Sequence, residues 1–359
     1  MSQLKPQPKP QPKPKTTATD VARLAGVSQS AVSRVFTPGA SASKATVTKV
    51  TAAAEQLGYR PDPLARAMIT GRTRMIGLVV AYLDNQFYPL ALELMSRAFQ
   101  ARGYHILVFM ADNADNRVET IVKQLIDYRV DGIVTASVAM SNDLTARLVE
   151  LGIPVANFNR GQDDPRLTDV TSDNETGGRR ATEFLIEGGH RRIAHISGWQ
   201  GASTGRDRAE GFARAMAGAG LTPFAVLDGM YDCDRATAIT RDLFSDANNR
   251  PDAIFAGNDH MALTVMDELR HGLGLSVPED VSLVGYDDVP AAAWPSYALT
   301  TMRQPINRMV TATVEAILDQ IDGMAAARKT LIESSLVIRK SARLPERSGD
   351  PPLSTESAP

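Results

Sequence analysis

Polar side chains suited to reading DNA bases gather in a short segment near the N-terminus. Gln29 and Ser30 fall in the first turn of a predicted helix, and Arg34 follows one turn later on the same face. Arginine matches the acceptors of guanine in the major groove, and glutamine matches the edge of adenine. Ser30, with its short side chain, also fits a solvated helix position. These residue types at this spacing predict a base-reading surface.

Two short helices joined by a tight turn are expected to present that surface. Thr17 followed by Asp20 is typical of a capping box, Gly26 can end the first helix in the left-handed region, and Ser28 can cap the second. The residues expected on the buried faces are Val21, Leu24, Ala25, Val32 and Val35. This pattern is typical of a helix-turn-helix, although any compact helical pair can show a glycine between two amphipathic runs.

A third helix and a linker follow the pair. The third helix is expected to run from a Ser43 cap to Gly58 and to bury Val47, Val50, Ala54 and Leu57. Three helices of this size make a domain over residues 17–60. Residues 61–74 then predict a hinge, in which proline begins a helix too short to be stable without a partner.

Charge is distributed unevenly along the 359 residues. Residues 1–74 hold 12 Lys and Arg against 3 Asp and Glu, whereas residues 75–359 hold 27 against 38. A basic module on an acidic body indicates a polyanionic partner held by the module. Four of the twelve cations lie in a Lys- and Pro-rich tail over residues 1–16, which is expected to be disordered and could act only as a solubilising segment. The segment 346–359 is expected to be a second disordered tail.

From residue 75 onward, apolar runs alternate with amphipathic helical stretches. Eight such runs are expected as strands, at residues 75–83, 105–111, 132–137, 154–158, 192–198, 224–229, 253–257 and 282–286, with a second series beginning near Asp173. This alternation predicts parallel sheets covered by helices and arranged in two α/β lobes. Ligands of such sheets bind beyond the carboxyl ends of the strands, so the loops that follow the strands are the candidate site.

The chain resembles the lactose-repressor (LacI/GalR) family of bacterial transcription regulators. The resemblance is carried by TDVARLAGVSQSAVSRVF, by SKATVTKVTAAAEQLGYRPDPLARAM, and by the later motifs SDNETGG, GGHRRIAHISG, RAEGF, FAGNDHMA, VSLVGYDD and LTTMRQP. It covers roughly residues 17–345. It implies an all-α helix-turn-helix DNA-binding domain, a two-lobed periplasmic-binding-protein-like effector and dimerisation domain over 75–345, a homodimer, and operator binding controlled by a small molecule. The operator is expected to be a double-stranded pseudo-palindrome.

The resemblance assigns further DNA contacts outside the base-reading face. Candidates for phosphate contacts are Thr17, Ser33 and Lys49, and Arg66 of the hinge is a further candidate for DNA binding. Val47 stands where the family often has arginine, so one backbone contact is expected to be missing. Met68 stands where many members insert a leucine wedge into the minor groove, a role methionine can fill, although it could instead only pack between the hinge helices.

Resemblance and strand-end position together predict the effector site. The expected contact residues are Phe87, Tyr88, Asn159, Arg160, Arg208, Tyr231, Asn258 and Asp287. Charged groups with amides and aromatic rings suit a polyol, so a sugar or sugar acid is the expected effector and a nucleobase is the alternative. For Arg208 and Asp287 the alternative is an ion pair that only holds the interface between the lobes. Whether the effector is an inducer or a corepressor stays open.

Other functions are less well supported by the residues. A solute-binding protein fits the lobes, but the chain carries a DNA module and its N-terminus lacks the apolar core of a signal peptide. No nucleophile–base set, phosphate loop or dinucleotide motif indicates an enzyme, and no cofactor is expected. The spacing of the histidines makes no metal site. One cysteine and no apolar run of transmembrane length fit a cytoplasmic, nucleoid-associated protein that does not enter membranes.

Overall fold

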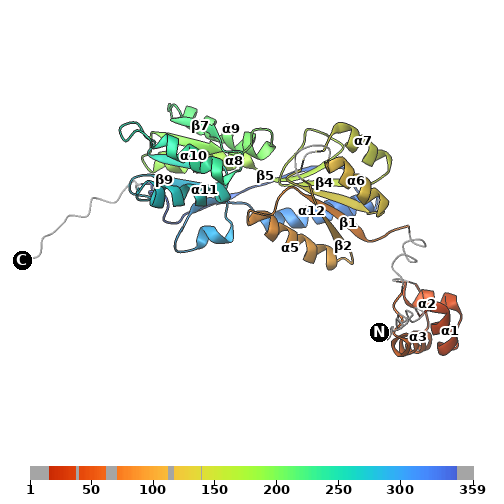
Figure 1. Cartoon of the computed structure of the whole chain (residues 1–359). Coiled ribbons are helices and arrows are strands. Elements are labelled where there is room, and N and C mark those ends of the chain that lie inside the picture. The colour runs from red at the N-terminus through yellow and green to blue at the C-terminus, as the bar shows by residue number, and fades with distance from the viewer. Residues whose placement is uncertain (1–15, 38–39, 62–70, 112–116, 139, 346–359) are drawn as a thin grey trace, which may run out of the picture. The chain divides into compact units, whose positions relative to one another are not determined.

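The computed structural model describes residues 16–37, 40–61, 71–111, 117–138 and 140–345. The chain forms two compact units, Met1–Thr73 and Arg74–Pro359. Figure 1 shows the first as a small helical unit and the second as two lobes, each built on its own sheet. The expected tails, and most of the expected hinge, lie outside the described residues.

The small unit consists of the helices α1 (Ala18–Ala25), α2 (Gln29–Val35) and α3 (Lys44–Leu57). The predicted caps are confirmed. Thr17 and Asp20 form a reciprocal capping box at the start of α1, and Ser28 accepts a hydrogen bond from the amide of Ala31. Gly26 ends α1 with a φ of 65°, which only glycine adopts without strain. Local signals therefore suffice to begin and end these helices.

The core of the small unit differs in two places from the predicted one. Val21, Ala22 and Ala25 of α1 pack against the other helices, whereas Leu24 is 46% exposed. The face of α1 that packs against the other two helices is centred one residue away from the expected face. Small alanines therefore lie at the contact between the helices. In α3 the buried face is one turn shorter than expected, because Val47 is 39% exposed while the face begins at Val50.

The first lobe is built on a six-stranded sheet in the order β11-β5-β4-β3-β1-β2. Its strands are β1 (Met75–Val80), β2 (His105–Met110), β3 (Gly132–Ala136), β4 (Val155–Phe158), β5 (Thr168–Ser172) and β11 (Lys329–Ile332). All of its pairings are parallel. Apolar residues of β1 alternate between its two faces. One face packs on α5 (Phe87–Gln100) and α12 (Ile306–Ile321), and the other packs on α6 (Arg117–Asp127) and α7 (Asn142–Glu150).

The second lobe repeats this plan with the order β12-β10-β9-β8-β6-β7. Its strands are β6 (Ile193–Ser197), β7 (Ala225–Asp228), β8 (Ala253–Ala256), β9 (Ser282–Asp287), β10 (Thr300–Arg303) and β12 (Ser335–Val337). One face packs on α8 (Asn174–Glu187) and α9 (Ser203–Gly218). The other packs on α10 (Cys233–Leu243) and α11 (Asp259–Asp267), which continues as a π-helical turn, Glu268–Gly272. A 3-10 turn, Pro290–Ala293, follows β9.

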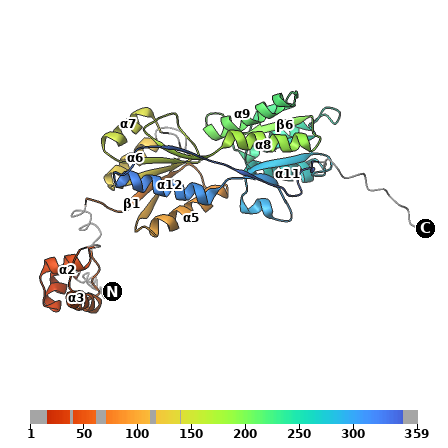
Figure 2. The ribbon, with the colours of Figure 1, turned by 180° about the vertical axis from the view of Figure 1, so that it is seen from behind.

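The chain passes between the lobes three times. It leaves the first lobe between β5 and α8, returns between β10 and α12, and crosses again between β11 and β12. Figure 2 shows α12 beside α5 on the first lobe, although these helices lie far apart in sequence. Three connecting segments allow the lobes to change their relative angle without either sheet unfolding, as hinge motions between domains require.

Several elements depart from the predicted ones. Four strands (β5, β10, β11 and β12) and the helix α12 were not predicted, and β12 runs antiparallel to β10. The first strand ends at Val80 rather than at residue 83. The sequence predicts helices that begin at Pro89 and at Asp207, whereas α5 begins at Phe87 and α9 begins at Ser203. Short strands at a sheet edge carry little periodic signal, so tertiary pairing decides them.

Helices α8 and α9 approach each other so closely that glycines form the contact. A Cβ atom on Gly178 would overlap the backbone of Arg208, and one on Gly211 would overlap the carbonyl of Glu175. The approach holds the backbone of α9 against α8 exactly where Arg208 projects toward the other lobe. Backbone packing therefore sets the position of a side chain that the sequence analysis selected.

Gly178→Ala is expected to destabilise the second lobe, because neither backbone can yield without separating the two helices. The expected loss in the free energy of unfolding is about 1–3 kcal/mol, measured by urea denaturation. Gly218→Ala, in α9 but with open space around its Cβ, is the matched control and should be neutral or gain about 0.5 kcal/mol. Equal stability of the two variants would contradict this packing.

Candidate functional site

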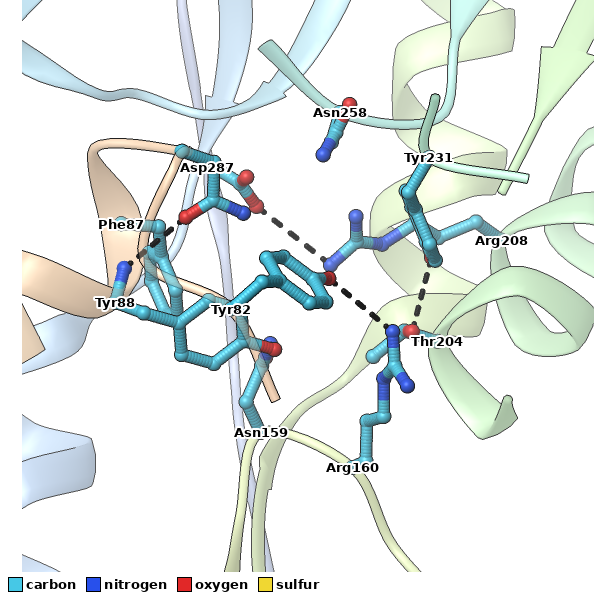
Figure 3. A pocket seen from close by; sticks show the side chains of 11 residues that line it. Tyr82, Phe87, Tyr88, Asn159, Arg160, Thr204, Arg208, Tyr231, Asn258 and Asp287 are labelled. Carbon is cyan, nitrogen blue, oxygen red and sulfur yellow. Dashed lines mark hydrogen bonds and ion pairs between the residues drawn. The ribbon is translucent and has the colours of Figure 1, made fainter. Parts of the chain in front are cut away.

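A small, nearly closed cavity between the two lobes, here called the interlobe cavity, has a volume of about 10 Å3, room for about one water molecule. Loops after β1 and β4 line it from the first lobe. The start of α9, the residues after β7 and β8, and the end of β9 line it from the second (Figure 3). All eight side chains predicted for the effector line this cavity: Phe87, Tyr88, Asn159, Arg160, Arg208, Tyr231, Asn258 and Asp287. Their placement at the carboxyl ends of parallel strands is the expected one, and their role in binding stays a prediction.

Three of the lining residues have a left-handed backbone. The φ angles are 71° at Asn159, 59° at Tyr231 and 126° at Asp287. Each such conformation in a residue other than glycine costs about 1–3 kcal/mol and persists only where the surroundings hold it. Opposite Tyr231, a Cβ on Gly198 would overlap the phenol ring, so the loop after β6 must have a glycine there. Strain of this kind gathers at functional sites.

Arg208 is the central residue among those that the second lobe contributes to the cavity lining, and its side chain is buried. Its Nε donates to Asn174 Oδ1 at 2.9 Å, its Nη1 donates to the carbonyl of Gly257 at 2.5 Å, and its Nη2 lies 3.7 Å from Asp287 Oδ1. The guanidinium also stacks 3.6 Å from the ring centre of Tyr286. The ion pair considered as an alternative to ligand contact is present. It lies within the second lobe, however, and not across the interface as expected, so it does not hold the lobes together.

Among the buried polar atoms that have no hydrogen-bond partner in the described part of the chain, two belong to first-lobe residues that line the cavity. Asn159 donates through Nδ2 to the Tyr88 hydroxyl at 3.0 Å, which leaves its Oδ1 without a donor. Arg160 donates to the carbonyl of Ser137 at 3.0 Å and to the Tyr82 hydroxyl at 3.2 Å, but its Nε has no acceptor. Leaving such groups unpaired costs free energy. A ligand hydroxyl can satisfy both, because it donates one hydrogen bond and accepts others.

Burial governs the acid–base behaviour of the site. It raises the pKa of Asp287, while the nearby Arg208 cation and a hydrogen bond from Gln304 lower it. Burial likewise raises the pKa of Asp259, which lies beside Asp287, and the negative charge of Asp287 raises it further. The pKa of Tyr82 is raised mainly by burial. The tyrosine hydroxyl therefore stays protonated at neutral pH and can donate to a ligand.

The two predicted aromatic residues have different surroundings. Phe87 is 3% exposed and stacks 6.1 Å from the ring of Phe158 in the core of the first lobe, so it forms the back wall of the cavity. The Tyr88 hydroxyl instead contacts Asn159. The ring that stands edge-on to Tyr88, at 5.3 Å, belongs to Tyr82. Among the aromatic residues that line the cavity, the tyrosines can therefore stack on a ligand, whereas Phe87 cannot.

Three lining residues were not predicted: Tyr82, Asn85 and Thr204. Asn85 accepts a hydrogen bond from the amide of Tyr88, and Thr204 accepts one from the Tyr231 hydroxyl at 2.9 Å. Asn85 lies in the loop after β1 and Thr204 lies in the first turn of α9. Both segments follow strands, so a finer search of the segments after strands could have found them. Tyr82 was hidden because the first strand was expected to continue past it.

The candidate DNA surface lies on the small unit, and its described residues are accessible. Gln29, Ser30, Ser33, Arg34 and Lys49 are all exposed. The hydroxyl of Thr17, also exposed, is engaged in the capping box, where it donates to Asp20 at 2.7 Å. Phosphate oxygens accept hydrogen bonds, so a phosphate contact from the Thr17 side chain would require its hydroxyl hydrogen to leave Asp20. Arg66 and Met68 lie outside the described residues, so their predicted roles stay predictions.

Arg34→Ala is expected to weaken binding to the specific site by about 1–3 kcal/mol and to relax the preference at one base pair. The guanidinium makes only a long hydrogen bond, 3.4 Å, to the carbonyl of Ser30, so it can reach a base without breaking structure. Fluorescence anisotropy with a selected operator and with random DNA measures both effects. An equal loss on the two DNAs would show that Arg34 contacts only phosphate.

The histidines of the second lobe have structural surroundings. His195 is stacked 4.6 Å from Phe255 and 5.0 Å from Phe212, and His190 contacts Ser282 at 2.8 Å. Within the described ranges, no three His, Cys, Asp or Glu side chains are arranged to hold a metal ion. In the same part of the chain, no helix has the length and apolar character needed to span a membrane.

Comparison with known proteins assigns both units. The family model "Bacterial regulatory proteins, lacI family" matches residues 17–62, and the model "Periplasmic binding protein-like domain" matches residues 182–342. The HTH-type transcriptional repressor PurR of Aliivibrio fischeri (strain ATCC 700601 / ES114) is 33% identical over 334 residues, which is 91% of this chain and 98% of that protein.

Two solved structures extend the comparison to the whole fold. The lac repressor dimer bound to operator and the anti-inducer ONPF has a TM-score of 0.82 at 26% identity, covering 91% of this chain and 99% of that one. The transcriptional regulator CelR in complex with cellobiose has a TM-score of 0.69 at 32% identity, covering 91% and 100%.

Proposed function

The chain belongs to the lacI family of bacterial regulatory proteins, and we propose that the interlobe cavity binds the effector that controls its affinity for operator DNA. Proteins of this family are transcriptional repressors that bind operator DNA and small-molecule effectors; they are not enzymes. The observation that carries the proposal is that all eight side chains selected from the resemblance and from strand-end position line one cavity between the two lobes.

The chemistry of the cavity favours a polyhydroxylated effector, a sugar or a sugar acid. The unpaired Asn159 Oδ1 accepts a hydrogen bond and the unpaired Arg160 Nε donates one, a combination that a hydroxyl satisfies. Asp287 adds an acceptor, and Arg208 can bind a second oxygen or a carboxylate. The complex of the similar CelR with cellobiose supports the same class. A nucleobase is the second candidate, because Tyr82, Tyr88 and Tyr231 offer aromatic faces.

The small unit would read the operator as one half of a homodimer. Gln29, Ser30 and Arg34 would contact base edges in the major groove, and Ser33 and Lys49 would contact phosphates. The dimer bound to operator in the similar lac repressor structure supports this arrangement. The hinge over residues 61–74, with Arg66 and Met68, would contact the minor groove at the centre of the pseudo-palindrome. As a repressor, the protein would act at the nucleoid in the cytoplasm.

Coupling between the two sites would run through the angle between the lobes. A ligand that contacts both lobes prefers one angle, and the three connecting segments let that angle change. The angle would then bias the hinges of the dimer toward or away from the operator-bound form. Such coupling is reciprocal, so operator DNA must change the affinity for the effector by the same factor.

The test measures ligand binding and operator binding on the full chain. Monosaccharides, disaccharides, sugar acids and purines are screened by thermal shift, since a ligand of the folded state raises its melting temperature. The binding compound is then added to the complex with an operator selected from random DNA. Arg160→Met should weaken ligand binding at least tenfold, whereas Arg166→Met, in the same loop but not lining the cavity, should not. A ligand that leaves operator affinity unchanged would refute the proposal.

A further inference from the structure

A second space, here called the outer pocket, adjoins the interlobe cavity on its solvent side. It offers about 1300 Å3 of open space and shares the side chains of Tyr82, Arg160 and Tyr231 with the cavity. Figure 3 shows these three side chains at the junction of the two lobes. These side chains form the wall between the two spaces, because Arg160 donates to the Tyr82 hydroxyl at 3.2 Å and its guanidinium carbon lies 5.6 Å from the centre of the Tyr231 ring. A ligand can span both spaces once the lobes open and this wall moves.

The outer pocket has an aromatic wall that the fold holds in place. The half-buried indole of Trp199, in the loop after β6, lies 5.8 Å from the guanidinium carbon of Arg160, which itself lies 5.6 Å from the Tyr231 ring. A Cβ on Gly201 would overlap the Trp199 ring, so this loop position must be glycine for the indole to lie where it does. Rigid placement of an aromatic ring lowers the entropic cost of binding against it.

The rest of the outer pocket is rich in hydrogen-bond acceptors. Asp84 of the first lobe and Asp232 and Asp234 of the second line it, and His260 lies 3.9 Å from Asp84 across the opening. An aromatic wall with carboxylates around it suits a sugar ring, whose C–H face packs on the indole while its hydroxyls donate to the acids. The same acids repel an anionic group, so a carboxylate on the ligand would not be tolerated here.

We propose, resting on the proposed function, that the effector is a neutral disaccharide or longer oligosaccharide. Opening of the lobes admits one ring into the interlobe cavity, where it satisfies Asn159 and Arg160. The glycosidic linkage passes between Tyr82 and Tyr231, and the next ring packs on Trp199 in the outer pocket. In each of the two spaces the ligand contacts both lobes. The second ring therefore adds to the binding free energy that favours one angle between the lobes.

The experiment uses the tryptophan itself as the reporter in the full chain. The sequence has two tryptophans, and Trp294→Phe leaves Trp199 as the only one. This variant is titrated with matched sugars: D-glucose with cellobiose and maltose, D-galactose with lactose and melibiose, and D-xylose with xylobiose. We expect one disaccharide to bind about tenfold or more tightly than its own monosaccharide and to change the Trp199 emission.

The role of the indole is then tested by substitution in the native background. Trp199→Ala should lower the affinity for that disaccharide about tenfold and leave the affinity for its monosaccharide unchanged, whereas Trp199→Phe should retain part of the preference. Isothermal titration calorimetry gives both affinities. Melting temperatures of the ligand-free variants show whether they are folded.

The outcomes separate this proposal from the proposed function. A monosaccharide, sugar acid or purine that binds as tightly as any disaccharide overturns the two-ring effector but leaves the interlobe cavity as the effector site. Lack of binding by every disaccharide, or Trp199→Ala without effect on a disaccharide that does bind, overturns it as well. A disaccharide that binds through Trp199 but leaves operator affinity unchanged supports the ligand class and refutes the control of DNA binding.

Discussion

Arg208→Ala is expected to lower the free energy of unfolding of the two-lobed unit by about 3–5 kcal/mol. The side chain is 2% exposed and is held by Asn174, the carbonyl of Gly257 and Asp287. Removing it leaves the carboxylate of Asp287 buried with only Gln304 as a close donor among the described residues. Both tryptophans of the chain lie in this unit, so tryptophan fluorescence during urea denaturation reports its unfolding.

A pair of further variants separates loss of the ion pair from loss of packing. Asp287→Asn combined with Arg208→Ala should be less destabilised than the sum of the two single changes, since the buried charge that lost its partner is gone. Arg208→Lys keeps a positive charge but cannot reach all three partners, so it should fold and yet respond poorly to the effector. Arg206→Lys, on the exposed side of the same helix, is the matched control. Wild-type stability of Arg208→Ala would refute the central role of this side chain.

His195 is expected to make the two-lobed unit less stable as the pH falls from about 6.5 to 4. Burial lowers the pKa of His195 to about 4, and the nearby Arg208 cation acts in the same direction, whereas a hydrogen bond to the carbonyl of Phe255 opposes it. In the unfolded chain a histidine titrates near pH 6.5. Between these values the unfolded state binds the proton and the native state does not, so stability falls by about 3 kcal/mol across that window.

The measurement compares the pH profile of the wild type with that of His195→Asn. Asparagine keeps a donor near the carbonyl of Phe255 but does not titrate, so the difference in unfolding free energy between the two proteins should shrink as the pH falls. The comparison is needed because the raised pKa of Asp287 and of Asp259 makes the native state bind extra protons, which gives the opposite slope. His271→Asn, at an exposed position of the same lobe, is the control. Parallel profiles for His195→Asn and the wild type would contradict the prediction.

The small helical unit was predictable because its signals are local. A capping box, a left-handed glycine and a serine cap each act within four residues, and each is found where it was expected. The predictions that failed in this unit concern tertiary packing. Leu24 and Val47 satisfy the helical period, but whether an apolar residue is buried depends on which side its neighbours cover. Periodicity selects a face only to within one residue.

The candidate site was predictable for a related reason. Tyr231, Asn258 and Asp287 lie at the carboxyl ends of strands of the second sheet, which share one edge, so the strand order already places them near one another. Asn159 follows a strand of the first sheet, and its place beside them depends on how the two lobes face each other. Tyr82 and Thr204 escaped notice because each depends on where a neighbouring strand or helix begins or ends. Phe87 was selected correctly as a lining residue, but its packing on Phe158 leaves it as a wall and not as a stacking surface.

The sequence by itself determined the two kinds of unit and the order of most of their elements, because these follow from short-range patterns. It also determined eight of the eleven side chains that line the interlobe cavity, through strand-end position together with the family resemblance. The tertiary structure alone decided that α12 returns to the first lobe, that three segments connect the lobes and that Arg208 pairs with Asp287 within one lobe. It also decided that Asn159 and Arg160 keep unpaired atoms facing the cavity and that Trp199 lies in a second pocket beside it. These features depend on contacts between residues distant in sequence, whose geometry no local pattern encodes.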